Sequence, residues 1–337
     1  MRPAHLGLIP LTPQGASHGF HLHTPIRCTP LGGVLPVSAF YEMIRGAFER
    51  AALAGWLPDS LQYGFVVNAL VSALIIGPLL GAVGTMVVAK RLAFFSQAVG
   101  HAALTGVAIG ILLGEVYTAP YVSLFSFCVL FALLMNFTRN QTRMASDTII
   151  GVFLAISLAV GASLLLFVTA RVNVHVLDTI MFGSILTVND FDLNLLFVIT
   201  FATAALGLAN YNRMLLSTFN PALAGVRGVR VRFQDYLFVL MITALTVASV
   251  KIVGAVLVEA LLLIPAAAAR NLARSLRSFV LLSIVFATLS CLLGILLPME
   301  LELPIPSGGA IIIVAAIFFF ATVLVRAGLR VFQEAAA

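Results

Sequence analysis

Residues 253–270 read VGAVLVEALLLIPAAAAR, an apolar run that carries one carboxylate and ends on an arginine. A helix that crosses the hydrocarbon core of a bilayer needs about 20 mainly apolar residues, and this run comes close to that length. Its carboxylate, Glu259, lies near the middle, where a charged side chain costs about 2.5–3.5 kcal/mol to insert. The stretch therefore predicts a membrane helix whose acidic group faces a bundle interior or a water-filled path.

Similar apolar runs fill the chain beyond residue 60. The chain is 61% hydrophobic and only 9% charged, whereas an ordinary soluble domain is roughly 25% charged. We expect crossings at 62–88, 94–113, 119–137, 147–170, 191–209, 235–250, 253–269, 278–297 and 308–327. Only Lys251 and Ile252 separate the sixth run from the seventh, so one of the two could be short or tilted. The predicted fold class is an all-α, polytopic transmembrane bundle of eight or nine spans.

Basic residues mark every second break between the apolar runs. Thirteen of the fifteen Lys and Arg residues beyond position 60 fall in five clusters. The clusters are Lys90 and Arg91; Arg139 and Arg143; Arg213, Arg227, Arg230 and Arg232; Arg270, Arg274 and Arg277; Arg326 and Arg330. Cytoplasmic loops of membrane proteins retain an excess of Lys and Arg. We therefore expect these breaks and the C-terminus in the cytoplasm, the N-terminus outside, and no role for the charge in binding nucleic acid.

The alternate breaks are acidic, and two segments lie outside the simple pattern of crossings. The acids are Glu115, Asp178, Asp190, Asp192, Glu300 and Glu302. Residues 171–190 are too short to cross twice and too apolar for a free loop, which predicts a re-entrant or interfacial helix around 177–186. Residues 1–60 hold seven of the fourteen prolines and four of the six histidines. We expect a poorly ordered or interfacial segment there, a permease domain over 61–330, and a tail over 331–337.

The sequence lacks the motifs of nucleotide-binding proteins and hydrolases. It has no GxxxxGK[ST] loop, no HExxH pair and no serine in a GxSxG turn. These absences argue against an enzyme and against ATP hydrolysis by this chain. The composition instead favours passage of a solute across the membrane, with no resident cofactor.

Glu259 and His101 are the main candidates for cation ligands along such a path. A carboxylate in a membrane span can bind a passing cation, although it could instead form a structural pair with Lys251 or His101. Gln97, His101 and Thr105 repeat every four residues and form one polar stripe on an apolar helix. Imidazole suits zinc and other first-row transition ions, whereas a polar stripe can also serve helix association.

Two further residues are weaker candidates for the ion path, and a nearby stripe has a structural meaning. Asn68 lies in the first span, and His175 lies beside the expected re-entrant segment. Ala102, Gly106, Gly110 and Gly114 repeat every four residues along the second span. Small residues at this spacing let helices approach closely in lipid, so the stripe predicts helix packing.

Residues 211–235 form the longest predicted cytoplasmic loop and contain signals for a short helix. Asn220 is a typical N-cap, Pro221 suits the first helical position, and Gly228 is a typical stop. This predicts a surface helix over 221–227, to which a partner protein that supplies the energy for transport could bind. The candidate coupling residues are Asn220, Pro221, Ala222, Leu223, Gly225, Arg227 and Gly228.

Several stretches together resemble the ABC-3 family of metal-import permeases. They are VVAKRLAFFSQAVGHAALTGVAIG (87–110), DTIIGVFLAISLAVG (147–161), FGSIL (182–186), NPALAGVRGV (220–229), VGAVLVEALLLIPAAAARNLARSL (253–276) and PIPSGGAIIIVAA (304–316). They occur in the family order and cover about residues 60–330. The sequence departs from the family pattern in having Gln97 where Asp is common and Glu259 where a small or hydroxyl residue is common.

The resemblance implies the transmembrane subunit of a bacterial ABC importer of the type II kind, in the inner membrane. It implies a homodimer whose partners are a cytoplasmic ABC ATPase and an extracytoplasmic metal-binding protein. The cargo would be zinc, manganese or iron(II), and residues 220–229 would form the coupling helix. Two alternatives remain open: a permease for a metal chelate such as a siderophore or corrinoid, and a gradient-driven metal carrier. A chelate needs a wide, mostly neutral channel, and a carrier is expected to show inverted repeats.

Overall fold

The computed structural model describes residues 42–43, 45–50, 59–115, 120–142, 144–169, 190–301 and 305–335. Within these ranges every regular element is a helix, and nine helices are long and apolar enough to cross a membrane. The predicted all-α membrane bundle is confirmed. His175, the expected helix around 177–186 and most of residues 1–60 lie outside the described residues.

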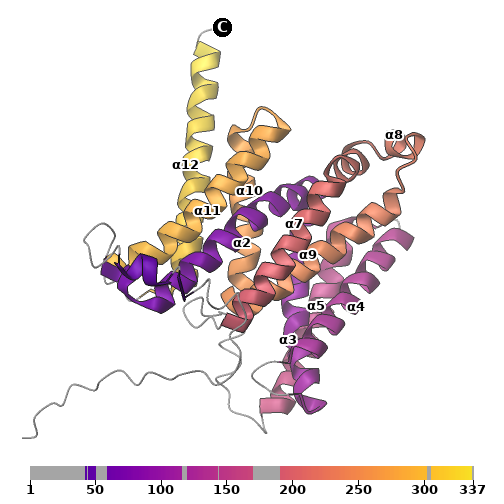
Figure 1. The fold of residues 1–337 in the computed structure, drawn as a ribbon. Coiled ribbons are helices and arrows are strands. Elements are labelled where there is room, and N and C mark those ends of the chain that lie inside the picture. The colour runs from indigo at the N-terminus through magenta and orange to yellow at the C-terminus, as the bar shows by residue number, and fades with distance from the viewer. Residues whose placement is uncertain are drawn as a thin grey trace, which may run out of the picture.

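The helices form two packed groups that meet at the centre of the molecule (Figure 1). The first group is α2 (Gly64–Ala89), α10 (Ala255–Leu272), α11 (Leu276–Glu300) and α12 (Ser307–Ala335). The second is α3 (Phe95–Leu112), α4 (Tyr121–Gln141), α5 (Ser146–Thr169) and α9 (Val231–Val253). Helix α7 (Asp190–Phe219) packs on α9, the short α8 (Pro221–Val226) follows it, and a 3-10 turn, η1 (Asp59–Gln62), precedes α2.

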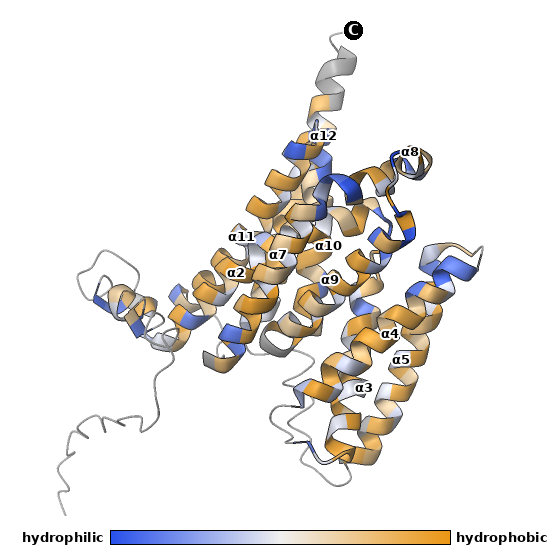
Figure 2. Ribbon diagram, turned by 45° about the vertical axis from the view of Figure 1, so that its right-hand side comes forward, coloured by the Kyte–Doolittle hydropathy of each residue, from blue (hydrophilic) through white to orange (hydrophobic). Residues whose placement is uncertain are grey.

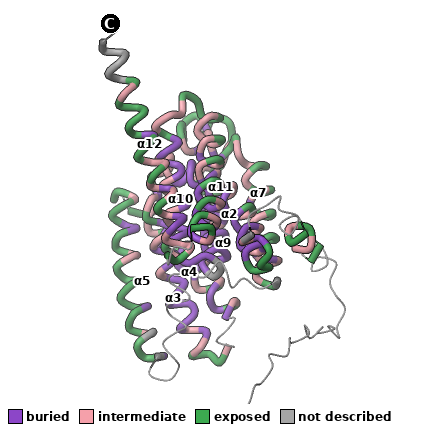
Figure 3. Tube along the Cα trace, turned by 90° about the vertical axis from the view of Figure 1, so that its left-hand side faces the viewer, coloured by how far each residue is buried: buried purple, intermediate pink, exposed green. Residues whose placement is uncertain are grey.

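The apolar surface of the bundle is largely exposed, as a bilayer requires. Helices α5 and α12 lie at the edge and present exposed residues along most of their length (Figure 3). Large apolar side chains such as Leu166, Phe320 and Leu324 are among the exposed ones. Figure 2 shows apolar rods with hydrophilic residues gathered near their ends. Lipid tails cover such surfaces at no hydrophobic cost, so their exposure is consistent with membrane insertion.

Glycines permit backbone-to-backbone contact at the helix crossings. A Cβ at Gly84 of α2 would lie 2.1 Å from the carbonyl oxygen of Leu262 on α10. The predicted small-residue stripe faces α4, because a Cβ at Gly106 would lie 3.1 Å from Leu124 Cα. Helix packing by this stripe is therefore confirmed, except that Gly114 follows the end of α3 and forms a turn at φ +85°.

The break between the sixth and seventh spans lies at Gly254, and the expectation of a break at Lys251 and Ile252 is wrong. Both of those residues continue α9, which ends at Val253. Gly254 has φ +92° and joins α9 directly to α10. Glycine adopts this backbone region without the steric cost that a Cβ imposes, so the chain reverses within one residue.

One end of the bundle collects most of the basic clusters. Helix α8, the connection between α10 and α11, and the last turns of α12 lie at the same end in Figure 1. The arginines of 227–232 and 270–277 are in or beside these elements. The acidic Glu115 and Glu300 follow helices that run to the opposite end. The alternation of charge along the chain therefore becomes a separation of charge in space.

Candidate functional site

The polar centre of the bundle lies where α3, α9 and α10 contact one another. A Cβ at Gly100 of α3 would lie 3.2 Å from the Cβ of Ala255, so α3 and α10 cross closely there. His101 follows Gly100, and Glu259 stands one turn beyond Ala255. The fold thus brings the two main candidate ligands, which are 158 positions apart in the sequence (259 minus 101), to one helix crossing.

Glu259 is half-buried, and among the described residues its carboxylate makes no hydrogen bond or ion pair. The structural pair with His101, one of the alternatives for this carboxylate, is therefore absent from the described contacts. The side chain of Lys251, the other alternative partner, lies outside the described structure. A carboxylate placed at a membrane helix crossing without a protein partner is suited to bind a mobile cation.

Four buried polar atoms on α3 and α9 have no hydrogen-bond partner among the described residues. They are His101 Nδ1 and Ser96 Oγ on α3, and Thr246 Oγ1 and Ser249 Oγ on α9. Buried polar groups are nearly always hydrogen-bonded in native proteins, so a cluster of unpaired ones needs an explanation. Water or an ion between these helices would supply the missing partners.

Sequence reasoning missed the hydroxyl groups of α9, although a signal for them exists. Thr243, Thr246 and Ser249 repeat every three residues, and all three are at most 1% exposed. Hydroxyl side chains in apolar helices commonly bond the carbonyl one turn back, as Thr243 does with Val239 at 2.7 Å. This ordinary role makes such a stripe uninformative until the neighbouring helices are known.

Part of the predicted stripe on α3 serves packing. Thr105 Oγ1 donates a hydrogen bond to the carbonyl oxygen of Ser157 on α5, at 3.5 Å. A Cβ at Gly161 of α5 would lie 2.8 Å from the same hydroxyl oxygen. For Thr105 the structural alternative is therefore the better interpretation, and the stripe divides between packing and the polar centre.

Asn68, one of the two weaker candidates, does not join the polar centre. Asn68 lies near the start of α2, and its Oδ1 accepts a hydrogen bond from Arg45 Nε at 2.7 Å. His175 lies outside the described residues, and both assignments stay predictions. The described part of the chain contains no group of three or more His, Cys, Asp or Glu residues able to hold a metal ion together.

Helix α8 forms where the sequence predicts a short surface helix. Asn220 Oδ1 accepts a hydrogen bond from the backbone N–H of Leu223 at 3.0 Å, which caps the first turn. The helix ends at Val226, one residue before the expected end, and Gly228 follows with φ +71°. Leu223 and Val226 are 41% and 86% exposed, so the helix presents apolar side chains beyond the bundle.

Basic residues surround α8 on its bundle side. Arg213, Arg227 and Arg230 line a hollow of about 370 Å³ together with Phe233 and Gln234. The arrangement combines exposed apolar groups with guanidinium groups, which is typical of surfaces that bind another protein. Candidate coupling residues from Asn220 to Gly228 thus share one surface, as the sequence predicts for them.

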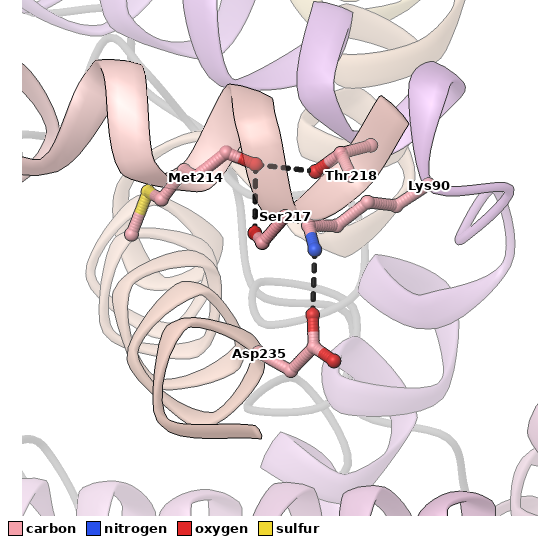
Figure 4. A network of polar contacts seen from close by, with 5 residues as sticks. All are labelled: Lys90, Met214, Ser217, Thr218 and Asp235. Carbon is pink, nitrogen blue, oxygen red and sulfur yellow. Dashed lines mark hydrogen bonds and ion pairs between the residues drawn. The ribbon is translucent and has the colours of Figure 1, made fainter. Parts of the chain in front are cut away.

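An ion pair ties the elements flanking α8 to α2 (Figure 4). Lys90 Nζ lies 2.6 Å from Asp235 Oδ1 and 5.6 Å from the centre of the Phe238 ring. Beside this pair, the hydroxyls of Ser217 and Thr218 at the end of α7 donate to the Met214 carbonyl (Figure 4). Sequence reasoning assigned Asp235 no role, because nothing local pairs it with Lys90.

The family model of the ABC 3 transport family matches residues 62–326, from the start of α2 into α12. The chain belongs to the ABC 3 transport family. The match covers the polar centre and the surface around α8. The first 61 residues lie outside the match, and the predicted limits of the permease domain stay a prediction.

Curated relatives of this ABC 3 permease include transporters for two metals. The manganese transport system membrane protein MntC of Listeria innocua is 30% identical over 79% of this chain and 92% of its own length. The manganese import system permease protein ScaB of Streptococcus parasanguinis is 31% identical over 77% of this chain and 89% of its own length. The high-affinity zinc uptake system membrane protein ZnuB of Haemophilus influenzae is 29% identical over 79% of this chain and 99% of its own length.

Solved structures show the same architecture. PsaBC from Streptococcus pneumoniae in complex with Fab matches with a TM-score of 0.67 and 30% identity, over 78% of this chain and 93% of that one. An inward-facing putative metal-chelate type ABC transporter matches with a TM-score of 0.64 at 18% identity, which shows the fold alone. This ABC 3 chain is therefore a transmembrane permease subunit with an ABC importer fold.

Proposed function

We propose that this permease carries a divalent transition metal ion into the cytoplasm, powered by a separate ABC ATPase. The observation that carries the proposal is the unpaired carboxylate of Glu259 on α10, one turn from the point where α10 crosses α3 next to His101. A carboxylate and an imidazole suit manganese, zinc and iron(II), and exclude none of them. Manganese is the first candidate, because MntC and ScaB are named for it, and zinc follows from ZnuB.

The sparse ligand set fits transport better than tight binding. An ion must bind favourably enough to enter the path and weakly enough to leave it. Glu259 and His101 supply two strong ligands, and the hydroxyls of Ser96, Thr246 and Ser249 supply weak ones. Water molecules complete the coordination shell. The ion is then passed on without the full set of protein ligands that a structural metal site uses.

The surface around α8 is the proposed docking site for the ATPase, with α8 as the coupling helix. Exposed Leu223 and Val226 would enter a groove on the ATPase, and Arg227 and Arg230 would meet acidic groups at its rim. Movement of α8 pulls on α9, which reaches the polar centre through Thr246 and Ser249. The same helix therefore connects the energy source to the ion path.

The remaining assembly follows from charge and family resemblance. The basic end faces the cytoplasm of the bacterial inner membrane, because cytoplasmic loops retain Lys and Arg. The start of α2 then lies outside and the end of α12 inside. A metal-binding protein delivers the ion at the acidic end, near Glu115 and Glu300. Two copies of the permease form the complete transmembrane unit, as the resemblance implies.

The alternatives of a chelate permease and a gradient-driven carrier are less well supported. The close approach of Gly100 to Ala255 leaves a narrow crossing beside a carboxylate, which suits a bare ion better than a siderophore or corrinoid. A gradient-driven carrier would work without the α8 surface. Uptake by the purified chain without its ATPase would favour that carrier.

Metal uptake by proteoliposomes that contain the permease and its ATPase tests the proposal. Glu259→Gln keeps the size of the side chain and removes its charge, so we expect uptake of manganese or zinc to fall at least about tenfold. Glu49→Gln, the same change at an exposed site away from the polar centre, is the matched control. Both variants should assemble with the ATPase. Normal uptake by Glu259→Gln would remove this carboxylate from the path.

A double-mutant cycle tests whether the two ligands bind the same ion. His101→Gln should raise the metal concentration needed for half-maximal uptake. If Glu259 and His101 contact one ion, the double variant should lose less than the product of the two single losses, because the second change removes an interaction already weakened. If the loss of uptake in the double variant equals the product of the two single losses, Glu259 and His101 do not contact the same ion.

A further inference from the structure

An apolar groove runs between α2 and α7 and extends to α11. It encloses about 390 Å³ and is lined almost wholly by apolar side chains, including Ile75 and Met86 of α2, Met214 of α7 and Ile284 of α11. The groove is separate from the polar centre, because none of the four unpaired polar atoms of α3 and α9 belongs to a residue that lines it.

A second hollow lies toward the basic end of α2, α7 and α11, and α10 also contributes to its lining. It also encloses about 390 Å³, and its cationic lining consists of Arg91, Arg270 and Arg274. On α2 and α11, the residues that line this hollow lie about one turn closer to the basic end than those that line the groove. Met86 is followed by Val88 and Ala89 on α2, and Val280 by Leu276 on α11.

The three guanidinium groups have no partner among the described residues. No described carboxylate lies within ion-pair distance of Arg91, Arg270 or Arg274, and all three residues are exposed. Arginine presents planar N–H donors that match the oxygens of a phosphate group. Three unpaired arginines around one hollow are therefore a site for an anionic oxygen ligand.

Arg91 holds a backbone conformation that normally belongs to glycine. Its φ is +57°, the only positive φ of a non-glycine residue in the described chain. The N–H of Leu92 bonds the Val87 carbonyl and that of Arg91 bonds the Val88 carbonyl, which together close α2 in a Schellman motif. A strained residue of this kind persists where the side chain has a use.

The length of the apolar groove matches one leaflet of a bilayer. Ile75 and Met86 are eleven residues apart on α2, which corresponds to about 16 Å at about 1.5 Å per residue. Half of a hydrocarbon core of about 30 Å is about 15 Å. The arginine hollow therefore stands at the level of the lipid head groups when the groove is filled by one leaflet's acyl chains.

We propose that this groove binds one anionic phospholipid of the leaflet at the basic end. The phosphate group contacts Arg91, Arg270 and Arg274, and an acyl chain lies along α2 and α7. The combination of an apolar groove one leaflet deep and three unpaired cations at its end fits no other ligand as well. Basic pockets between membrane helices are known to favour anionic head groups. The lipid would also hold α7 against α2, beside the surface around α8.

The first experiment measures lipid binding to the full chain purified in detergent, by native mass spectrometry. The probes are phosphatidylglycerol, phosphatidylcholine with the same acyl chains, and inorganic phosphate. We expect a bound phosphatidylglycerol, weaker phosphatidylcholine and no retained phosphate. Arg274→Gln should weaken phosphatidylglycerol binding about fivefold, as expected for one basic residue near an anionic lipid surface. Arg277→Gln, the same change on an exposed arginine outside the groove, should leave binding unchanged.

Arg91→Gly separates lipid binding from folding. Glycine relieves the left-handed backbone and removes the guanidinium group in one change. Thermal stability without lipid should therefore be equal or higher, whereas phosphatidylglycerol binding should fall about fivefold. A fall in stability without lipid, or unchanged binding, would contradict the role given to Arg91.

A second pair of variants tests the apolar part of the groove. Ala204 of α7 lines the groove, and the neighbouring Ala205 is exposed outside it. Ala204→Phe fills the space of the acyl chain and should reduce binding of phosphatidylglycerol, whereas Ala205→Phe should not. Equal effects of the two variants would show that the acyl chain lies elsewhere.

Other outcomes would overturn the proposal in favour of a different occupant. Equal losses in Arg274→Gln and Arg277→Gln would indicate a general effect of surface charge. Retention of inorganic phosphate in place of lipid would indicate a free-anion site. If Arg274→Gln lost the ATPase but kept the lipid, the hollow would be part of the docking surface. If Ala204→Phe separated a dimer without affecting lipid, a second copy would cover the groove.

Discussion

Lys90 Nζ and Asp235 Oδ1 lie 2.6 Å apart and join the end of α2 to the start of α9. The two side chains are 8% and 19% exposed, so the pair is largely withdrawn from water. Helix α8 lies between α7 and α9 in the chain, which places this pair beside the surface proposed to receive the ATPase. The pair therefore links that surface to α2, which lines the apolar groove proposed to bind a phospholipid.

Removal of one partner of this pair should destabilise the protein. Asp235→Asn leaves the Lys90 ammonium group without its counter-charge in a mostly buried position, and we expect a loss of about 3 kcal/mol of stability. Thermal unfolding in detergent measures the loss as a lower midpoint. The double variant Lys90→Met with Asp235→Leu should be more stable than Asp235→Asn, because the Lys90 ammonium group is no longer left without its counter-charge, although Arg139 loses its acidic neighbour in both variants. A double variant that is less stable would contradict this account.

The crossing of α2 and α10 should not tolerate a side chain at Gly84. The Leu262 carbonyl oxygen occupies the space that a Cβ would need, at 2.1 Å. Gly84→Ala should therefore cost about 1–3 kcal/mol, as overpacking of a dense interior does. Gly151→Ala on α5 is the control, since a Cβ there meets nothing within 4 Å. Comparable unfolding midpoints for the two variants would show that the helices separate easily.

The exposed apolar residues of α8 should be needed for assembly with the ATPase. We expect Leu223→Asp and Val226→Asp each to abolish co-purification, because a charge cannot enter an apolar groove without a large desolvation cost. Leu301→Asp, the same change on an exposed leucine at the other end of the bundle, should keep the complex intact. Intact complexes for all three variants would move the docking site away from α8.

The basic end should be closed to reagents outside the cell. A membrane-impermeant thiol reagent applied to intact cells should not label Arg230→Cys, whereas it should label Tyr63→Cys at the opposite end. Cys28, which lies outside the described residues in the segment expected outside the cell, is replaced by serine in both variants, and the buried Cys128 and Cys291 should contribute little background. Labelling of residue 230 from outside would reverse the orientation and remove the proposed coupling helix from the ATPase side.

Much of the fold follows from local composition, and a few particular residues show where that stops. The capped helix at Asn220 was predictable, because an N-cap and its first turn are neighbours in the chain. The break at Gly254 was misplaced by two to three residues, since Lys251 is polar yet continues a helix. Hydropathy indicates where a chain leaves the membrane. The turn between α9 and α10 depends instead on the backbone torsion of Gly254, which hydropathy does not report.

The sequence by itself determined the number of apolar spans, the separation of basic and acidic ends, and the short helix after residue 220. Each of these depends on the transfer of consecutive residues between water and lipid, which is a local property. Only the tertiary structure decided that α3 and α10 cross at Gly100 and Ala255, that Lys90 pairs with Asp235, and that Arg91, Arg270 and Arg274 line one hollow. Such contacts depend on how each helix is rotated about its axis and where it crosses its neighbours, and close packing of side chains from distant segments sets both.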